Sequence, residues 1–266
     1  MTDLTGVPLT EIRERLVASR SSHERKQMAA LLRRDLRRGA RSLSAWVERR
    51  EAARRVERAR LSKLFARRNR LFASGLKFVA GVDEVGVGPL AGPLVAAAVI
   101  LPRRVDFDVL QRLDDSKRLN PRIRKVLALE IRKQALAVFV SEVSCDEVDR
   151  LNTYRGALAA MARAVAGLGV QPDHVLVDAR TIPDLAVPQT ALVHGDAIDG
   201  SIAAASIVAK VYRDAIMCRL AEQYPGYGFN RHMGYGTQEH LDALRRLGPT
   251  PVHRLSFAPV ARAIAR

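Results

Sequence analysis

The sequence lacks most of the features that mark secreted, membrane-spanning or thiolate-metal proteins. Its 266 residues include only two cysteines, Cys145 and Cys218, which cannot form a disulfide framework or a four-cysteine zinc site. No stretch approaches the ~18 consecutive apolar residues of a membrane-spanning helix. The first residues have neither the basic nor the apolar region of a signal peptide. We therefore expect a cytoplasmic protein with no membrane partner.

Aromatic residues are also scarce, at 5% of the chain, and there is a single tryptophan. The hydrophobic fraction of 48% and the charged fraction of 27% are nevertheless ordinary for a globular protein, so a sizeable core can form. This composition excludes collagen-like, purely coiled-coil and wholly disordered chains. The length fits one large domain, or one domain with an appendage.

Acidic residues are few in the N-terminal part of the chain. Residues 1–80 hold 21 Lys and Arg against 8 Asp and Glu, whereas the rest of the chain holds 23 against 20. A nearly neutral body therefore carries a cationic arm. The arm is either a solvated basic face or a polyanion grip, and neutralised phosphates release counterions and so drive binding. We favour nucleic acid over an anionic membrane, because the basic run has few bulky apolar residues to bury in lipid.

The chain changes character at Gly75. Apolar residues recur at helical spacing before it, at Ile12, Leu16 and Val17 and again over residues 42–69. After it the sequence is apolar and punctuated by glycine. We predict a basic helical extension over residues 1–75, contacting nucleic acid, and a main domain over 76–266. In the alternative, apolar residues of the extension pack on the main domain and hold it together: Trp46, Leu61, Leu64 and Phe65.

The main domain alternates strand and helix patterns. Asn120 before Pro121 is a helix N-cap, and Ser144 with Glu147 is a capping box. Alternating strands and helices predict an α/β domain with a mixed sheet flanked by helices. The expected strands are residues 76–82, 94–101, 137–143, 174–177 and 190–193, and the expected helices are 121–135, 145–167, 201–222 and 237–247.

Four carboxylates stand at the ends of β-type runs: Asp83, Glu84, Asp178 and Asp196. A charge at the end of a buried strand is unfavourable unless it is paired or binds a metal. Adjacent strand residues point to opposite faces, so Asp83 and Glu84 can share a site only if the strand distorts there. Oxygen donors without a His or Cys cluster suit Mg²⁺ or Mn²⁺ rather than Zn²⁺. Beside a cationic arm, this set indicates metal-assisted phosphodiester chemistry.

Short motifs lie between residues 76 and 260. In chain order they are 83–93 (DEVGVGPLAGP), 115–117 (DSK), 177–178 (VD), 195–197 (GDA), 201–210 (SIAAASIVAK), 213–214 (RD), 224–229 (YPGYGF), 234–237 (GYGT), His240 and 253–259 (HRLSFAP). Together they resemble bacterial ribonuclease HII, a type 2 ribonuclease H. The first 75 residues resemble, less specifically, the helical extension of some members.

The resemblance implies a ribonuclease-H-like fold with a small C-terminal helical part. It implies hydrolysis of RNA in RNA–DNA hybrids and nicking on the 5′ side of ribonucleotides in duplex DNA, leaving 3′-hydroxyl and 5′-phosphate ends. The four carboxylates would hold two divalent ions, Mg²⁺ or Mn²⁺. Asp214 matches an auxiliary acid of the family, or is an ordinary helix-surface charge. We expect the protein to act as a monomer.

The resemblance also implies residues that sense the single 2′-hydroxyl of a ribonucleotide. The family uses a Gly-Arg-Gly loop, which here is Gly86, Val87 and Gly88, so the guanidinium is missing. Tyr235 would bond the 2′-hydroxyl and stack on the next sugar, unless it is a buried core tyrosine.

Further positions matter to the same resemblance. Lys117 and Lys210 would contact phosphate or support carboxylates, unless they are plain surface lysines. Asp199 and Gly200 are a second departure, at the start of a predicted helix.

Two other classes of function compete with this reading. A different metal nuclease, such as a junction resolvase, would use similar carboxylates but would not need the glycine loop and the Gly-Tyr-Gly segment. A non-catalytic nucleic-acid-binding protein would explain the basic arm, but not four acids that repel phosphate unless metal neutralises them.

Overall fold

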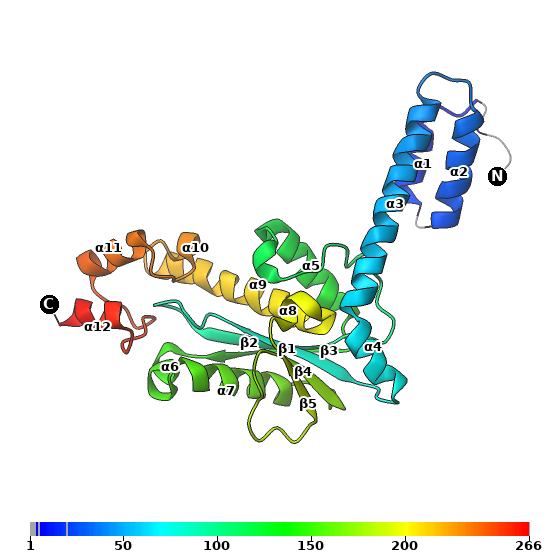
Figure 1. The fold of residues 1–266 in the computed structure, drawn as a ribbon. Helices are drawn as coiled ribbons and strands as arrows, with labels where there is room; N and C mark the ends of the chain where they lie inside the picture. Colours follow the sequence, from blue (N-terminus) through cyan, green and yellow to red (C-terminus); the bar gives the residue numbers. More distant parts are fainter. Residues whose placement is uncertain (1–3, 5, 20, 266) are drawn as a thin grey trace. The chain divides into compact units, whose positions relative to one another are not determined.

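The chain forms two compact units in the computed structural model, which describes residues 4, 6–19 and 21–265. The first unit is Met1–Arg60 and the second is Leu61–Arg266. Helix α3 (Ala40–Leu64) begins in the first unit and ends in the second (Figure 1). Each unit has its own hydrophobic core.

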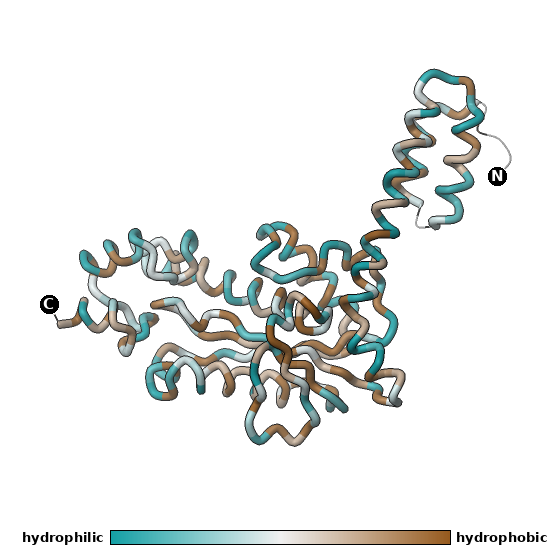
Figure 2. The backbone as a smooth tube through the Cα atoms, in the orientation of Figure 1, coloured by the Kyte–Doolittle hydropathy of each residue, from teal (hydrophilic) through white to brown (hydrophobic). Residues whose placement is uncertain are grey.

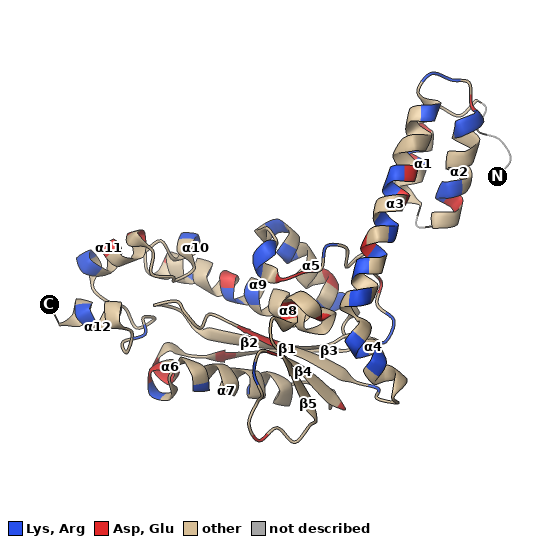
Figure 3. Cartoon of the chain, in the orientation of Figure 1, with Lys and Arg blue, Asp and Glu red and all other residues tan. Residues whose placement is uncertain are grey.

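The first unit is a helical bundle of α1 (Leu9–Ala18), α2 (Ser22–Arg34) and the first part of α3. The sequence analysis did not predict α2, which Ser21 caps by accepting a hydrogen bond from the Glu24 N–H. Lys and Arg positions are spread along these helices (Figure 3). The apolar stripes meet in a small core made of Leu4, Ile12, Leu16, Met28, Ala29, Leu32, Ala40 and Val47.

The second unit is built on a five-stranded mixed sheet in the order β3-β2-β1-β4-β5. Strand β1 is antiparallel to β2 and parallel to β4; β2 is antiparallel to β3, and β4 is parallel to β5. The mixed α/β sheet predicted from the sequence is confirmed. The strands are β1 (Val79–Val85), β2 (Leu94–Ile100), β3 (Ala137–Val143), β4 (His174–Asp178) and β5 (Gln189–Leu192).

Helices cover both faces of this sheet (Figure 1). Helices α5 (Pro121–Gln134) and α9 (Gly200–Gln223) pack on one face, and α7 (Thr153–Ala166) packs on the other. Every residue of β2 is buried, because alternate side chains enter the two cores. The central strands are accordingly mostly hydrophobic in Figure 2. Gly81 permits the close approach of α9, since a Cβ there would lie 2.1 Å from the Ser201 carbonyl carbon.

The boundary between the units differs from the one expected at Gly75. Leu61, Leu64 and Phe65 are buried in the core between the sheet and α9. Helix α4 (Ala66–Ala73) adds Phe72, which packs with Val79 of β1. The expected continuous helix over 42–69 is therefore two helices, and its last residues belong to the second unit. Residues 61–75 are as basic as the arm, but their buried apolar side chains place them in the second unit.

Short elements complete the second unit. The helix expected over 145–167 breaks at Asn152, whose φ is +68°, into α6 (Cys145–Leu151) and α7. A 3₁₀ turn, η1, spans Ser116–Arg118, and α8 spans Gly195–Ile198. The C-terminal part contains α10 (Phe229–His232), α11 (Gln238–Leu247) and α12 (Ala258–Ile264). Among the described residues, no helix is both long and apolar enough to cross a membrane.

Candidate active site

Asp83 and Glu84 lie inside strand β1, not in a turn after it. The ladder with β2 continues through both residues to Val85, so the distortion that the sequence analysis required at this pair is absent from that ladder. Asp83 pairs with Ala97, which belongs to the α9-side core, and Glu84 pairs with Ala96 of the α7-side core. The two carboxylates therefore leave the strand toward different faces.

Asp178 and Asp196 reach the same edge of the sheet. The parallel pairing of β1 with β4 ends at Val82 and Val177, so Asp83 and Asp178 both follow the last paired residues. Asp178 Oδ1 accepts a hydrogen bond of 2.6 Å from the Gly195 N–H. This bond holds the start of α8 at the end of β4 and brings buried Asp196 to the edge. Residues 83, 84, 178 and 196 thus lie at one edge of the sheet, and their joint role as metal ligands stays a prediction.

The convergence shows in the ionisation of the carboxylates. Burial raises the pKa of Asp83 well above its usual value, and the charges of Glu84 and Asp178 raise it further. Burial also raises the pKa of Glu84, against the influence of Arg180. The pKa of Asp196 is raised by burial, then by Asp115 and Asp178. Like charges forced together in a low dielectric produce these shifts.

Two cations and a serine pair border the cluster. Lys117 Nζ lies 3.7 Å from Asp196 Oδ2, and Arg180 Nη1 lies 3.6 Å from Glu84 Oε1. Ser116 and Ser206 share a buried hydrogen bond of 2.9 Å that ties η1 to α9. Arg180 was missed in the sequence, although it stands two residues after Asp178. Its guanidinium also lies 5.1 Å from the Tyr154 ring centroid.

The donor chemistry of the cluster fits divalent cations. As the side chains stand, no three of the described His, Cys, Asp or Glu residues form a group that could hold a metal ion. Glu84 Oε2 is nevertheless buried without a hydrogen-bond partner. A buried oxygen without a donor, among mutually repelling carboxylates, fits a cation-binding set that tightens around its ligand. The oxygen-only donors match Mg²⁺ or Mn²⁺.

Asp214 and Lys210 pair with each other on α9. Lys210 Nζ donates to Asp214 Oδ1 at 2.6 Å, and Arg124 Nη2 lies 3.5 Å from the other oxygen of Asp214. A metal-ligand role for Asp214 stays a prediction, and its carboxylate already has two cationic partners.

The departure at Asp199 and Gly200 has a structural reason. Asp199 caps α9 by accepting from the Ser201 N–H at 2.8 Å. A Cβ on Gly200 would meet the Phe65 ring at 2.5 Å. The pair therefore begins α9 and makes room for Phe65, which belongs to the core of the same unit.

The glycine loop and Tyr235 lie against each other. A Cβ on Gly88 would lie 3.8 Å from Tyr235 Cε1. The Tyr235 residue is 45% exposed, which excludes the core-tyrosine alternative. Val87 packs with its apolar neighbours at the α7-side core. Since Gly86 follows Glu84 by two residues, this loop begins beside the carboxylate cluster.

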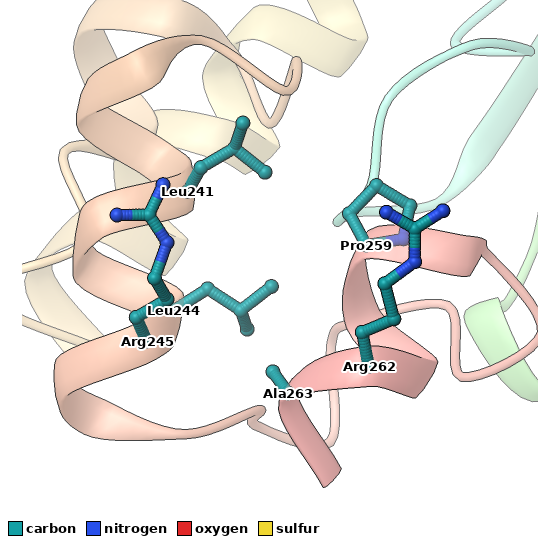
Figure 4. A pocket seen from close by; sticks show the side chains of 6 residues that line it. All are labelled: Leu241, Leu244, Arg245, Pro259, Arg262 and Ala263. Carbon is teal, nitrogen blue, oxygen red and sulfur yellow. The ribbon is translucent and has the colours of Figure 1, made fainter. Parts of the chain in front are cut away.

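A separate hollow lies between α11 and α12 (Figure 4). Leu241, Leu244 and Arg245 line it from α11, and Pro259, Arg262 and Ala263 line it from the segment of α12. It contains none of the predicted site residues.

Comparisons with known proteins agree with this geometry. The family model described as "Ribonuclease HII" matches residues 80–260. A ribonuclease HII from Anaeromyxobacter sp. is 47% identical over 98% of this chain and 82% of its own, so the match reaches into the N-terminal unit. One from Geobacillus thermodenitrificans is 50% identical over 88% of this chain and 89% of its own.

Solved structures share the fold. The ribonuclease H2 of Pyrococcus horikoshii superposes with a TM-score of 0.58 at 25% identity, covering 71% of this chain and 98% of its own. An Archaeoglobus fulgidus ribonuclease HII, solved with PCNA, gives 0.56 at 28% identity over 68% and 95%. The family match, the relatives and the shared fold define an enzyme of the ribonuclease H class, a metal-dependent hydrolase. Within that class, the chain belongs to the ribonuclease HII family.

Proposed function

We propose that the enzyme hydrolyses the RNA strand of RNA–DNA hybrids and nicks 5′ of ribonucleotides embedded in duplex DNA, leaving 3′-hydroxyl and 5′-phosphate ends. One observation carries the proposal. Four carboxylates, of which Asp83 and Asp196 are buried, lie beside a glycine loop that begins two residues after Glu84, and the exposed Tyr235 lies against that loop. The cluster suits phosphodiester hydrolysis, and the adjacent loop and ring suit the reading of a sugar. Family membership supports the substrate.

The four carboxylates Asp83, Glu84, Asp178 and Asp196 would hold two divalent ions, Mg²⁺ or Mn²⁺. When bound, such ions activate the attacking water and stabilise charge on the leaving oxygen. The chain's own part is to fix these oxygens in place. The Gly195 N–H holds Asp178, and the Glu84 N–H donates to Asp83 Oδ1 at 2.7 Å.

Lys117 is the cation best placed to meet the substrate. Its side chain is 82% exposed while its Nζ stays near Asp196, so it can turn to a phosphate oxygen at the site. Lys210 is only 17% exposed and bonded to Asp214. We propose that Lys210 acts on the site indirectly, by holding Asp214.

Tyr235 and the glycine loop would recognise the ribonucleotide. The 2′-hydroxyl is the group that distinguishes RNA from DNA at one position. The loop backbone at Gly86 and Gly88 would reach a sugar, since Gly88 carries no side chain to block it and Gly86 makes room for Arg213 beneath the loop. The Tyr235 ring beside Gly88 would supply the hydroxyl contact and stack on the following sugar.

Cleavage of three matched duplexes tests the proposal: an RNA–DNA hybrid, a DNA duplex with one ribonucleotide, and the same duplex entirely of DNA. We expect the first two to be cut only with Mg²⁺ or Mn²⁺, with a 5′-phosphate on the downstream product, and Asp178→Asn to remove the activity. Cleavage of an all-DNA four-way junction instead would favour a resolvase. Binding without cleavage under either metal would favour a non-catalytic binder.

For the N-terminal unit we propose direct contact with nucleic acid. Its half-buried Trp46 is flanked by Arg50, 4.7 Å from the ring centroid, and by Arg13, at 5.8 Å. Leu9, Gly39 and Leu43 help to line the hollow beside the ring. An aromatic ring among guanidinium groups is typical of nucleic-acid-binding surfaces. The expected partner is the substrate duplex, bound by one copy of the enzyme.

Because Trp46 is the single tryptophan, its fluorescence reports this contact in the intact enzyme. We expect quenching on addition of duplex, reversed by salt. Arg13→Gln should weaken the quenching more than Arg15→Gln, which removes a charge from the same helix where it pairs with Glu11. Unchanged fluorescence at saturating duplex would refute the contact at Trp46.

Two free thiols support a reducing compartment for the enzyme. Cys145 is buried and Cys218 is exposed, and neither is in a disulfide. An exposed free thiol persists in the cytoplasm, where thiols stay reduced, and we propose that compartment.

A further inference from the structure

Two arginines are fully buried beneath the proposed ribonucleotide sensor. Arg213 of α9 and Arg254, in the segment before α12, are both 0% exposed. Within the described chain, the hydrogen-bond acceptors of both guanidinium groups are backbone carbonyls. Charged side chains are almost never fully buried unless they are paired. Burying a charged guanidinium group costs free energy, so two such groups in one place call for a specific explanation.

Arg213 joins the two loops of the sensor. Its Nε donates to Pro93 O at 2.9 Å and its Nη2 to Ala91 O at 3.1 Å, both in the segment that follows the glycine loop. Its Nη1 donates to Met233 O at 3.0 Å, two residues before Tyr235. A planar, forked donor is the side chain that can hold three carbonyls in fixed directions.

Arg254 holds the glycine loop itself. Its Nη1 donates to Val87 O at 2.8 Å, and its Nη2 donates to Gly86 O at 2.5 Å and Gly92 O at 3.0 Å. The Arg254 N–H also bonds Leu90 O at 2.9 Å. The carbonyls on both sides of Val87 therefore point into the protein.

The absence of side chains at three glycines makes room for Arg213 and for close contact between the two loops. A Cβ on Gly86, whose φ is +91°, would lie 2.3 Å from Arg213 Nε. A Cβ on Gly92 would lie 3.2 Å from Arg213 Nη2. The two loops also bond directly, since the Leu90 N–H donates to Gly234 O at 2.8 Å. A Cβ on Gly234 would meet Ala91 O at 2.3 Å, so no side chain can separate them.

We propose that Arg213 and Arg254 are positioning residues that clamp the glycine loop and the Tyr235 loop into one rigid reader of the ribonucleotide. The inference rests on the proposed function. By drawing six carbonyls inward, the guanidinium groups fix where the loop backbone and Tyr235 meet the sugar. Their charges also make the electrostatic potential at the loop more positive. In this chain Val87 stands where the family has an arginine in that loop.

Substitution of each arginine by lysine tests the clamp, because lysine keeps the charge and loses the fork. Arg68→Lys is the matched control. Arg68 is 1% exposed in the same unit, and it lies over the rings of Phe65 and Phe72 rather than at the sensor. The readouts are the melting temperature, kcat and KM on the single-ribonucleotide duplex, and inhibition by the all-DNA duplex.

We expect Arg213→Lys and Arg254→Lys to lose at least about tenfold in preference for the ribonucleotide duplex, since a small misplacement of binding groups can cost two orders of magnitude. Arg68→Lys should lower the melting temperature with the preference unchanged. In a double-mutant cycle with Tyr235→Ala, Arg213→Lys should be non-additive and Arg68→Lys additive. If Arg213→Lys and Arg254→Lys lower only the melting temperature, as expected for Arg68→Lys, the clamp proposal is overturned.

A measurement on the native enzyme covers the case in which the lysine variants do not fold. The Leu90 and Arg254 amides should exchange hydrogen as slowly as the amides of α9, because both are bonded inside the clamp. Exchange as fast as that of the exposed residues Asp184 and Ala186 would overturn the proposal. If the native enzyme itself does not prefer the ribonucleotide duplex, the proposed function fails, whatever the variants show.

Discussion

Arginine is mostly a surface charge in the first unit, whereas the second unit also buries it without an acidic partner. In the first unit most of the described arginines are exposed, and several pair with an acid on the surface, as Arg15 does with Glu11. The buried Arg25 of that unit pairs with the buried carboxylate of Glu51. In the second unit Arg213 and Arg254 are fully buried, and their guanidinium groups donate to backbone carbonyls.

The difference shows which arginines have an effect that can be predicted from the amino-acid composition. An exposed guanidinium acts at long range, and its effect adds to that of its neighbours and weakens with salt. A count of charges therefore predicts it. A buried guanidinium acts through the direction of its hydrogen bonds, so its effect depends on carbonyls that are distant in sequence. Arg254, for example, holds Val87, more than 160 positions earlier.

The largest expected effect separates the two units by truncation. Removal of residues 1–60 should leave a folded enzyme, whereas removal of 1–75 should not. The longer deletion also removes Leu61, Leu64 and Phe65 from the core. At roughly 1.5–3 kcal/mol for each buried side chain, the loss approaches the ~5–15 kcal/mol stability of a whole domain. Circular dichroism and thermal melting measure both.

The shorter truncation also tests the basic arm. It should bind duplex more weakly, with a salt slope reduced by ~0.9 for each lost phosphate contact on B-form DNA, while kcat changes less than affinity. A folded truncation with an unchanged salt slope would contradict a grip by the arm. A truncation at residue 60 that unfolds would contradict the independence of the second unit.

The next largest effect is on the carboxylates. Asp83→Asn should reduce kcat by at least about a hundredfold, because several kcal/mol of charge stabilisation are lost and about 1.4 kcal/mol is a factor of ten. Without metal the variant should melt no lower than the native enzyme, since burial and like charges already raise the pKa of Asp83. Asp199→Asn, at another buried aspartate, is the control and should retain most activity.

Tyr235→Ala should have a smaller effect. Stacking on nucleic acid is worth about 1–3 kcal/mol per base, and a sugar contact should lie near the lower end, so we expect roughly a fivefold loss of preference for the ribonucleotide. Steady-state kinetics on the ribonucleotide and all-DNA duplexes measure it. Tyr212→Ala is the control, because it removes a half-buried tyrosine whose hydroxyl donates to Glu142 Oε1, outside the carboxylate cluster. Equal losses in both variants would deny Tyr235 a specific role.

The smallest effect concerns acid stability. Burial, and then His240, lowers the pKa of His253 to about 4, from 6.5. The unfolded chain therefore binds more protons between these values, and the stability that neutral His253 contributes is full above pH 6.5 and is lost as the pH falls toward 4. Melting temperatures across this range should fall less in His253→Asn than in the native enzyme. Parallel curves would show that another group controls the loss.

Parts of the fold could be predicted because they depend on local chemistry. Asn120 accepts from the Ile123 N–H and starts α5, as its capping pattern indicates. Strand β3 has the expected bounds of residues 137 and 143. The break at Asn152 was not predicted, because its positive φ has no strong sequence signal. Neither was the membership of residues 61–75 in the second unit, since a helix pattern does not say which core its apolar side enters.

The sequence by itself determined the mixed α/β class, the basic arm, the family and the identity of the four strand-end acids, because periodicity, charge and short motifs are local properties. Only the tertiary structure decided that Asp83 and Glu84 leave an undistorted strand, that Tyr235 lies exposed against Gly88, and that two buried arginines donate to the backbone carbonyls of the glycine loop and its neighbours. These arrangements come from packing between segments far apart in the chain. The direction of a buried hydrogen bond is set by both of its ends.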